Sequence, residues 1–348
     1  MTQEHIRLGI ISFAHGHIHR YIDEIKKFPD ADIVVAWDDD LKRGIENTFK
    51  YHLDWESNLE NLLARTDIDA VFITSPTNKH AEHCIMAAKA KKHILLQKPM
   101  ALSLAACDSI IKAVNENQVK FSMCHQMRAD PINQKIKALL DEKAVGNLTI
   151  VRRRHAINVL LNPNWATPDN WHLDPVQNMG MFMDDASHAT DWFNWMFGRP
   201  TSVIAEIDNI VTDVAPDDNG VAIYRFEGGI MGILLNSSTQ LAAQSTTEIY
   251  GDNGTIIQDY GDAPSSHLPV KEAPLRLYQK GMSEWKAFDF PVAPHHTRIS
   301  AVPRPLIDYL KDRGAPLATA EDGRVAIEMV LGAYESAKSG IRFHFPRQ

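Results

Sequence analysis

The first third of the chain alternates short runs of β-branched and apolar residues with stretches of helical periodicity. We predict strands at 7–13, 33–37, 70–74, 93–96 and 119–123, separated by helices at 18–28, 59–65, 80–91 and 104–116. Neighbouring parallel strands need a long crossover connection, which is usually a helix. The alternation therefore predicts an α/β domain built on a doubly wound parallel sheet.

The pattern changes after about residue 126. Longer alternating strands are predicted at 148–156, 202–211, 221–226, 230–237 and 246–257, with helices near 132–140, 181–197, 305–311 and 321–337. Turn signals at 227–229 and 252–254 favour antiparallel pairing. At 348 residues the chain is long for a single core. We therefore expect two domains, 1–125 and 126–348, the second an α+β domain with a large, mostly antiparallel, open-faced sheet.

Charge and composition exclude some classes of function. The chain is 44% hydrophobic and 23% charged, as expected for a globular protein, and its net charge is −8. Nucleic-acid affinity comes largely from clustered Lys and Arg, so we expect no nucleic-acid partner. The one basic run, Arg152 to Arg154, lies in a predicted strand, where neighbouring side chains point to opposite faces.

No apolar run is long enough to cross a membrane, and the first residues lack the layout of a signal peptide. We therefore expect no membrane partner and a cytoplasmic location. Cys84, Cys107 and Cys124 form no CxxC pair, so neither a disulfide framework nor a zinc knuckle is indicated.

The loop after the first predicted strand lies where dinucleotide-binding folds carry the glycines of G-x-G-x-x-G. Here Ser12, Ala14 and His17 take the three glycine positions, with His15 and Gly16 between the last two. Asp38 ends the second strand 21 positions beyond His17, near the spacing at which an acidic residue contacts the adenosine ribose. A carboxylate there favours NAD over NADP, although Arg43 is near enough to leave NADP open.

Two further segments make the pattern more specific: the run from Ala70 to His80, which includes Thr74-Ser75-Pro76, and the strand 93–96 followed by Gln97-Lys98-Pro99. With the opening strand and Asp38, they resemble the glucose-fructose oxidoreductase and inositol dehydrogenase family (Gfo/Idh/MocA). The resemblance continues through Gln126-Met127-Arg128, Trp171, Asp174-Pro175, Asp184, His188 and Asp191. It implies an NAD(P)-binding Rossmann domain followed by a domain for substrate binding and oligomerisation.

The resemblance also implies roles for individual residues. The expected cofactor-binding residues beyond the first loop and Asp38 are Thr74, Ser75, Pro76, Asn78, His80, Gln97, Lys98 and Gln126. Lys98 matches the family lysine that contacts the substrate hydroxyl and the nicotinamide ribose. Gln97 departs from the usual glutamate, which leaves open what that carboxylate does for the charge and position of the lysine.

Asp184 and His188 are four residues apart, so on a helix they share one face, with Asp191 three further on. Oxidising an alcohol requires removal of the hydroxyl proton, which a neutral histidine can accept while a carboxylate orients it. The pair also matches the catalytic residues of the family. We expect His188 to take the proton, Lys98 to polarise the oxygen, and Asp184 to orient the substrate or His188.

The expected activity is hydride transfer between a nicotinamide and a hydroxyl-bearing carbon of a sugar, polyol or sugar derivative. Such ligands should lie beyond the carboxyl ends of the parallel strands, between the two domains. Candidate substrate-pocket residues in the second domain are His155, Trp165, Trp171 and His172. An open sheet face, and the pairing through that sheet that is common in the family, indicate a homodimer or homotetramer.

Two other interpretations stay open, although we expect no resident metal. His15, His17 and His19 alternate, and alternating histidines on an extended segment can converge on one metal, as in a metal-dependent enzyme. The altered glycine loop also allows a non-catalytic NAD-binding sensor. Retained Lys98, Asp184 and His188 count against the sensor.

Overall fold

The computed structural model describes residues 5–267, 271–292 and 294–346, and the chain divides into two compact units. The first runs to Ala129 and includes Arg298–Arg324, while the second comprises Asp130–Thr297 and the chain from Val325. This differs from the predicted division at residue 125, because Arg298–Arg324 returns to the first unit. The returning segment joins the first unit because its apolar side chains, including Val302, Leu306 and Ile307, pack into that unit's core.

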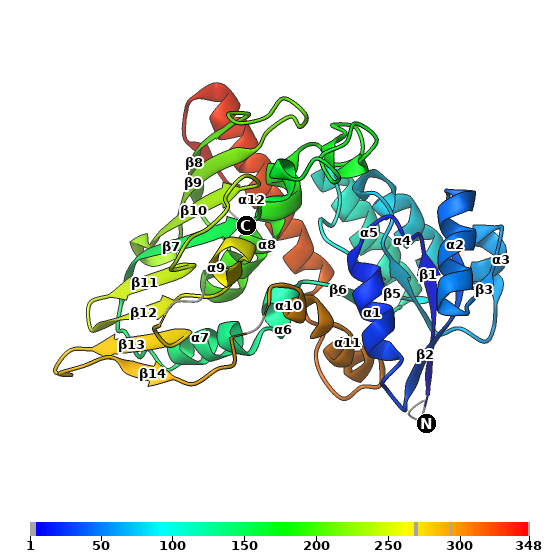
Figure 1. Cartoon of the computed structure of the whole chain (residues 1–348), viewed down its shortest axis with the longest axis horizontal. Coiled ribbons are helices and arrows are strands. Elements are labelled where there is room, and N and C mark those ends of the chain that lie inside the picture. The colour runs from blue at the N-terminus through cyan, green and yellow to red at the C-terminus, as the bar shows by residue number, and fades with distance from the viewer. Residues whose placement is uncertain (1–4, 268–270, 293, 347–348) are drawn as a thin grey trace. The chain divides into compact units, whose positions relative to one another are not determined.

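The first unit contains the predicted doubly wound sheet (Figure 1). Six parallel strands lie in the order β3-β2-β1-β4-β5-β6, so the order reverses on either side of β1. The strands are β1 (Ile6–Ile11), β2 (Ala31–Trp37), β3 (Asp54–Trp55), β4 (Ala70–Ile73), β5 (His93–Leu96) and β6 (Phe121–Met123). The crossover helices are α1 (His17–Ile25), α2 (Leu41–Tyr51), α3 (Leu59–Ala64), α4 (His80–Lys89, after the 3-10 turn η1, Thr77–Lys79) and α5 (Leu104–Asn117).

α2 and β3 were absent from the prediction. The apolar positions of α2 lie on its outer side, where Phe49 is 83% exposed and Leu41 62% exposed. Its buried side instead uses the small residues Gly44 and Thr48, together with Tyr51. Leu41, Ile45 and Phe49 recur at the four-residue spacing of a helix, but this apolar stripe faces outward and not into the core.

The second unit is built on a mostly antiparallel sheet, as predicted. Nine strands lie in the order β14-β13-β12-β11-β7-β10-β9-β8-β15, and among the described strands of this sheet only β7 and β10 pair in parallel. They are β7 (Leu148–Ala156), β8 (Ser202–Asp208), β9 (Asn219–Arg225), β10 (Met231–Ser237), β11 (Thr247–Gly251), β12 (Gly254–Gln258), β13 (Leu275–Gln279), β14 (Lys286–Phe288) and β15 (Phe343–His344).

The remaining elements are mostly helices that connect the strands or flank the sheet. They are α6 (Gln126–Ala129), α7 (Pro131–Asp141), η2 (Val159–Leu161), η3 (Trp171–Leu173), α8 (Met181–Phe197), η4 (Glu227–Gly229), α9 (Ala263–His267), α10 (His296–Ser300), α11 (Pro303–Leu310) and α12 (Ala320–Ser339). No helix in the described part of the chain is both long and apolar enough to cross a membrane.

α8 is the central helix of the second unit and packs against β7, β9 and β10. Every residue of α8 from Met181 to Phe193 is buried, because other elements pack on the sides of the helix that do not contact the sheet. One is α7, where Asn133 accepts a hydrogen bond of 3.0 Å from the indole N–H of Trp192. α12 contributes another, since the backbone carbonyl of Ala326 accepts from Thr190. Polar side chains on α8 are therefore held in fixed surroundings.

Candidate active site

The loop after β1 is clamped between the carboxyl ends of β2 and β4. The backbone N–H of Ser12 donates to the carbonyl of Trp37 (2.7 Å), and the N–H of His15 donates to the carbonyl of Thr74 (2.9 Å). The hydroxyl of Thr74 also donates to the carbonyl of Ser12. Ser12 has a φ of 70°, the left-handed conformation that glycine adopts easily. The loop therefore makes the tight turn of the fingerprint without its first glycine.

Asp38, the expected ribose contact, lies directly beside this loop. Its Oδ2 accepts the backbone N–H of Phe13 at 2.7 Å, and Arg43 binds both carboxylate oxygens, with Nε at 2.9 Å and Nη2 at 2.6 Å. Burial alone would raise the pKa of Asp38, but these hydrogen bonds and one from the N–H of Asp40 outweigh burial and lower the pKa. Asp38 is a buried, ionised carboxylate inside an ion pair.

The segment after β4 forms a rigid turn. Thr74, Ser75 and Pro76 are buried, whereas Asn78 is exposed. The ring nitrogens of His80 lie 2.8 Å from the carbonyl oxygen of Pro99 and 2.9 Å from that of Ser75. The ring of His80 therefore joins the turn after β4 to the segment after β5.

Gln97 and Lys98 follow β5, and both are buried. The side-chain oxygen of Gln97 accepts the backbone N–H of Lys98 at 2.9 Å, which assigns the amide nitrogen to the other side. That nitrogen donates to the hydroxyl of Tyr21 at 3.1 Å and lies 3.3 Å from Nδ1 of His17. The two departures from the family pattern, Gln97 and His17, therefore contact each other. A neutral amide donor favours an unprotonated Nδ1 on His17.

The three alternating histidines do not converge. The rings of His15 and His17 meet edge to face, 4.4 Å apart, whereas Nδ1 of His19 bonds the hydroxyl of Tyr51 at 3.0 Å. Burial and the charge of Lys50 lower the pKa of His19. Among the described residues, no group of three or more His, Cys, Asp or Glu side chains is arranged to hold a metal ion. The three side chains therefore do not form one convergent group.

The first unit fits a dinucleotide on two observations. Gly16 precedes α1 in open space, where even an added Cβ would meet nothing within 4 Å. Gln126 in α6 is 1% exposed, and its Oε1 has no hydrogen-bond partner among the described residues. A buried amide oxygen without a partner is costly unless a ligand supplies the donor. The first loop, the end of β4, Lys98 and Gln126 would hold the cofactor.

α8 carries the predicted acid–base pair. Asp184, His188 and Asp191 are all buried, and Asp184 and His188 share one helix face as their spacing predicted. Oδ2 of Asp184 lies 3.2 Å from Nδ1 of His172 in η3. The ring of His188 lies beside that of His155 on β7, with centroids 5.0 Å apart.

The four residues proposed for the substrate pocket gather around this pair. The ring of His172 stacks on Trp171, with centroids 3.7 Å apart, and lies 5.5 Å from that of Trp165. The backbone N–H of His172 donates to the side chain of Asn170, which fixes the short turn that carries it. The second unit thus holds two groups of side chains around this pair, one beside His188 and one beside Asp184. Imidazole and carboxylate groups of this kind can exchange protons with a hydroxyl.

Two residues that sequence reasoning missed hold the start of α8. Asp217 accepts the backbone N–H of Phe182 at 2.6 Å, and the hydroxyl of Tyr334 donates to the other oxygen of Asp217 at 2.7 Å. Tyr334 also accepts the N–H of Met183. Burial raises the pKa of Asp217. They satisfy free N–H groups of the two residues directly before Asp184, and no local sequence signal pairs residues so far apart.

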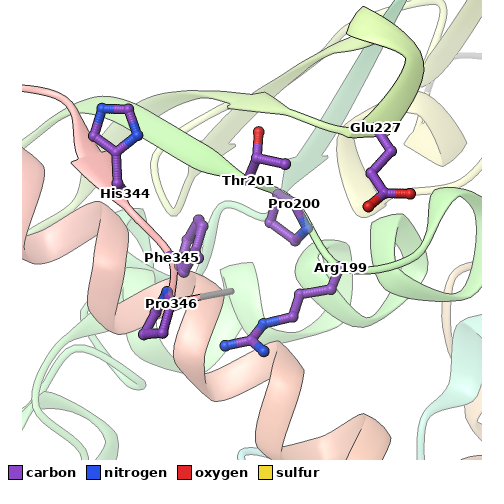
Figure 2. A pocket seen from close by; sticks show the side chains of 7 residues that line it. All are labelled: Arg199, Pro200, Thr201, Glu227, His344, Phe345 and Pro346. Carbon is purple, nitrogen blue, oxygen red and sulfur yellow. The ribbon is translucent and has the colours of Figure 1, made fainter. Parts of the chain in front are cut away.

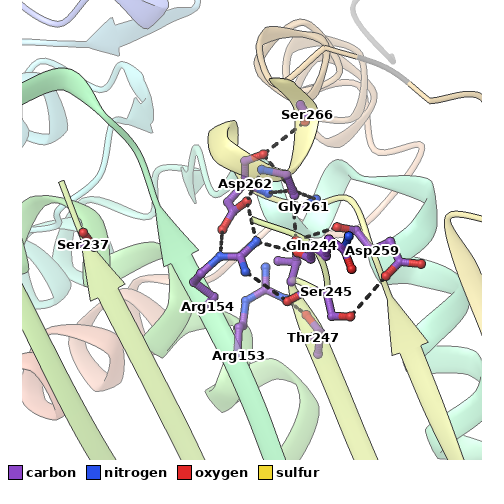
Figure 3. A network of polar contacts seen from close by, with 12 residues as sticks. Arg153, Arg154, Ser237, Gln244, Ser245, Thr247, Asp259, Gly261, Asp262 and Ser266 are labelled. Atoms are coloured by element: carbon purple, nitrogen blue, oxygen red, sulfur yellow. Dashed lines mark hydrogen bonds and ion pairs between the residues drawn. The ribbon is translucent and has the colours of Figure 1, made fainter. Parts of the chain in front are cut away.

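The basic run on β7 has internal partners. Arg152 bonds Glu248 at 2.7 Å, and Arg153 is fully buried, with its guanidinium 4.3 Å from the ring centroid of Trp192. Arg154 pairs with the buried carboxylate of Asp262 at 2.7 Å, within the polar network drawn in Figure 3. The run is therefore part of the scaffold that holds β7, and with it His155.

A surface cavity of about 620 Å³ lies elsewhere in the second unit. Its walls are the turn Arg199–Thr201, Glu227 and the segment His344–Pro346 (Figure 2). The turn follows the carboxyl end of α8, and that end is about 20 Å along the helix from Asp184. No predicted site residue lines this cavity.

Comparison with known proteins gives matches over both units. Residues 7–125 match the model of an oxidoreductase family with an NAD-binding Rossmann fold. Residues 133–257 match the model of the GFO/IDH/MocA C-terminal domain. Together the two matches extend over more than half of the chain.

Individual relatives match along nearly the whole chain. Myo-inositol 2-dehydrogenase of Thermotoga maritima is 24% identical, over 95% of this chain and 96% of its own. The NADP-dependent scyllo-inositol 2-dehydrogenase IolW of Bacillus subtilis is 22% identical over 96% and 94%. The WlbA dehydrogenase of Bordetella pertussis, solved in complex with NADH and UDP-GlcNAcA, is 21% identical and covers all of both chains with a TM-score of 0.83. The last similarity supports the fold.

Proposed function

Because the chain belongs to the GFO/IDH/MocA family of NAD-binding oxidoreductases, we propose that it moves a hydride between a nicotinamide and a hydroxyl-bearing carbon of a sugar, polyol or sugar derivative. The observation that carries the proposal is the cluster around Asp184 and His188, which places proton-exchanging groups beside two indole rings. Aromatic faces commonly pack against the C–H groups of sugar rings. The inositol dehydrogenases among the relatives support the same substrate class.

In the proposed reaction a bound nicotinamide supplies the hydride acceptor. Lys98, at the carboxyl end of β5, binds the reacting oxygen and stabilises negative charge as the O–H bond breaks. The proton passes to the histidine cluster, with His188 as its first acceptor. Asp184 holds His172 and orients the substrate. Reduction uses the same groups in reverse order.

The test is a spectrophotometric screen at 340 nm. Purified protein is mixed with NAD⁺ or NADP⁺ and a panel of inositols, aldoses and sugar acids, and NADH or NADPH with the corresponding ketones. We expect turnover of at least one polyol or sugar, lowered about 10² to 10⁴-fold in kcat by His188→Asn. His52→Asn is the matched control, because His52 is exposed and in a left-handed conformation that asparagine tolerates. Tight NADH binding without turnover of any substrate would favour the sensor and contradict the proposal.

We also propose that the protein self-associates through the face of the second sheet opposite α8. Ile204, Ile223 and Ile233 lie side by side in register across β8, β9 and β10 on that face. Val221 on the same face is 43% exposed and Ile204 is 37% exposed. Exposed apolar side chains in one row favour burial against a second copy.

Light scattering coupled to gel filtration tests this association. We expect a dimer or tetramer that Val221→Asp converts to smaller species. Phe49→Asp is the control, since Phe49 is more exposed but lies on α2 of the first unit. A monomeric wild-type protein would overturn the proposal.

A further inference from the structure

Asp38 has no acceptor capacity left for a ligand. A carboxylate offers about four acceptor positions. Those of Asp38 are taken by two donors of Arg43 and the backbone N–H groups of Phe13 and Asp40, with the hydroxyl of Ser12 at 3.4 Å. Its side chain is 0% exposed. A ribose hydroxyl could reach it only if the ion pair with Arg43 opened.

The residue after Asp38 has an accessible carboxylate, whereas the carboxylate of Asp38 is buried. The side chain of Asp39 is 43% exposed, and its Oδ1 accepts from Nη2 of Arg43 at 2.9 Å. Arg43 is 30% exposed, and its Nη1 makes no hydrogen bond to residues 5–267, 271–292 or 294–346. The outer surface of the ion pair therefore offers an acceptor, Asp39, beside a donor, Nη1 of Arg43. Adjacent ribose hydroxyls can use both, because each is a donor and an acceptor.

This surface lies where the adenosine half of the cofactor is expected. It follows β2, whose carboxyl end pairs with that of β1, and Asp38 is tied to the loop after β1 through Phe13. An acidic residue at this point of a dinucleotide-binding fold contacts the ribose. An acidic residue therefore lies at the expected point after β2, but the accessible carboxylate is that of Asp39, the residue after Asp38.

We propose that Asp39 and Arg43, and not Asp38, bind the adenosine ribose, and that Asp39 makes the site favour NAD over NADP. The inference rests on the proposed function, of which it specifies the cofactor. Asp38 is then a positioning residue that holds Arg43 and the loop.

The charges explain the direction of the preference. Arg43 is balanced by Asp38 and Asp39, which are its two ion-pair partners. A 2′-phosphate would approach Asp39 directly and be repelled. Without the charge of Asp39, one Nη2 donor of Arg43 becomes available, and a guanidinium binds phosphate well.

The experiment measures Kd for NADH and NADPH by isothermal titration calorimetry, with no turnover needed. We expect wild-type protein to prefer NADH. Asp39→Asn should shift the ratio of the two Kd values toward NADPH by about 10-fold or more, since it removes the carboxylate charge that repels the 2′-phosphate. Arg43→Gln should weaken NADH binding, because the ribose loses its donor.

Asp40→Asn is the matched control. It removes the same charge one residue away but keeps a side chain that caps α2 equally well. The ratio of the Kd values for NADH and NADPH in Asp40→Asn should stay within about 3-fold of the wild-type ratio. An unchanged ratio in Asp39→Asn, an equal shift in Asp40→Asn, or a wild-type preference for NADPH would overturn the inference and leave the proposed function standing. If neither cofactor bound the wild-type protein, both would fail.

Discussion

Oδ2 of Asp184 lies 3.2 Å from Nδ1 of His172, so the carboxylate on the central helix of the second unit contacts an imidazole that a short turn carries to it. His188, one helical turn along α8, lies instead beside the ring of His155. Asp184 and His188 therefore occupy one helix face but have different neighbours, and their contributions to a reaction can be separated.

Asp184→Asn is expected to lower kcat/KM by about 10² to 10⁴-fold, because the amide removes the charge that faces His172 and cannot stabilise its cation. His172→Gln, which leaves the charge of Asp184 in place, should lower it less. Steady-state kinetics on the best substrate measures both. Equal activity of Asp184→Asn and wild type would remove Asp184 from the mechanism.

Lys98→Met is expected to abolish most of kcat while NADH still binds, since Lys98 is proposed to act on the reacting oxygen. Lys92→Met is the matched control. Lys92 is also buried and directly precedes β5. Its ammonium donates to the carbonyls of Arg65 and Ile68 and so supports the fold. That variant should lose stability and keep its kcat. Comparable loss of kcat in both would show that Lys98 is structural.

His83 predicts a pH-dependent stability. Burial lowers its pKa to about 4, from an ordinary value of 6.5, so the folded state favours the neutral ring. The stabilisation is complete above pH 6.5 and is lost as the pH falls toward 4. Between pH 7 and pH 5 this imidazole should account for about 2 kcal/mol of the free energy of unfolding. Urea denaturation should show a smaller pH effect for His83→Gln, and an identical effect would contradict the assignment.

Asp217→Ala should destabilise the second unit by about 1 to 2 kcal/mol, because it leaves the N–H of Phe182 at the start of α8 without its acceptor. It should also lower kcat, since Asp184 and His188 follow within two turns. Tyr334→Phe removes a single hydroxyl from the same arrangement and should have a smaller effect in the same direction. Thermal unfolding and kinetics of the two variants test this order.

The elements that sequence reasoning predicted best are largely buried in the structure. The helix at 181–197 and the strands at 93–96 and 148–156 coincide with α8, β5 and β7. α2 was missed although its apolar residues recur at helical spacing, and β13 and β14 were missed as short strands late in the chain. The return of Arg298–Arg324 to the first unit depends on long-range packing that no local pattern encodes.

The candidate site likewise has features that the sequence predicts and features that only the structure shows. Sequence by itself determined the parallel and antiparallel sheets, the family, and the common face of Asp184 and His188, because each follows from periodicity or from ordered motifs. Tertiary structure alone decided that Asp184 meets His172, that Gln97 meets His17, and that Arg43 encloses Asp38. The physical reason is that side-chain partners distant in sequence are chosen by packing, and a buried charge takes whichever counter-charge the fold brings within reach.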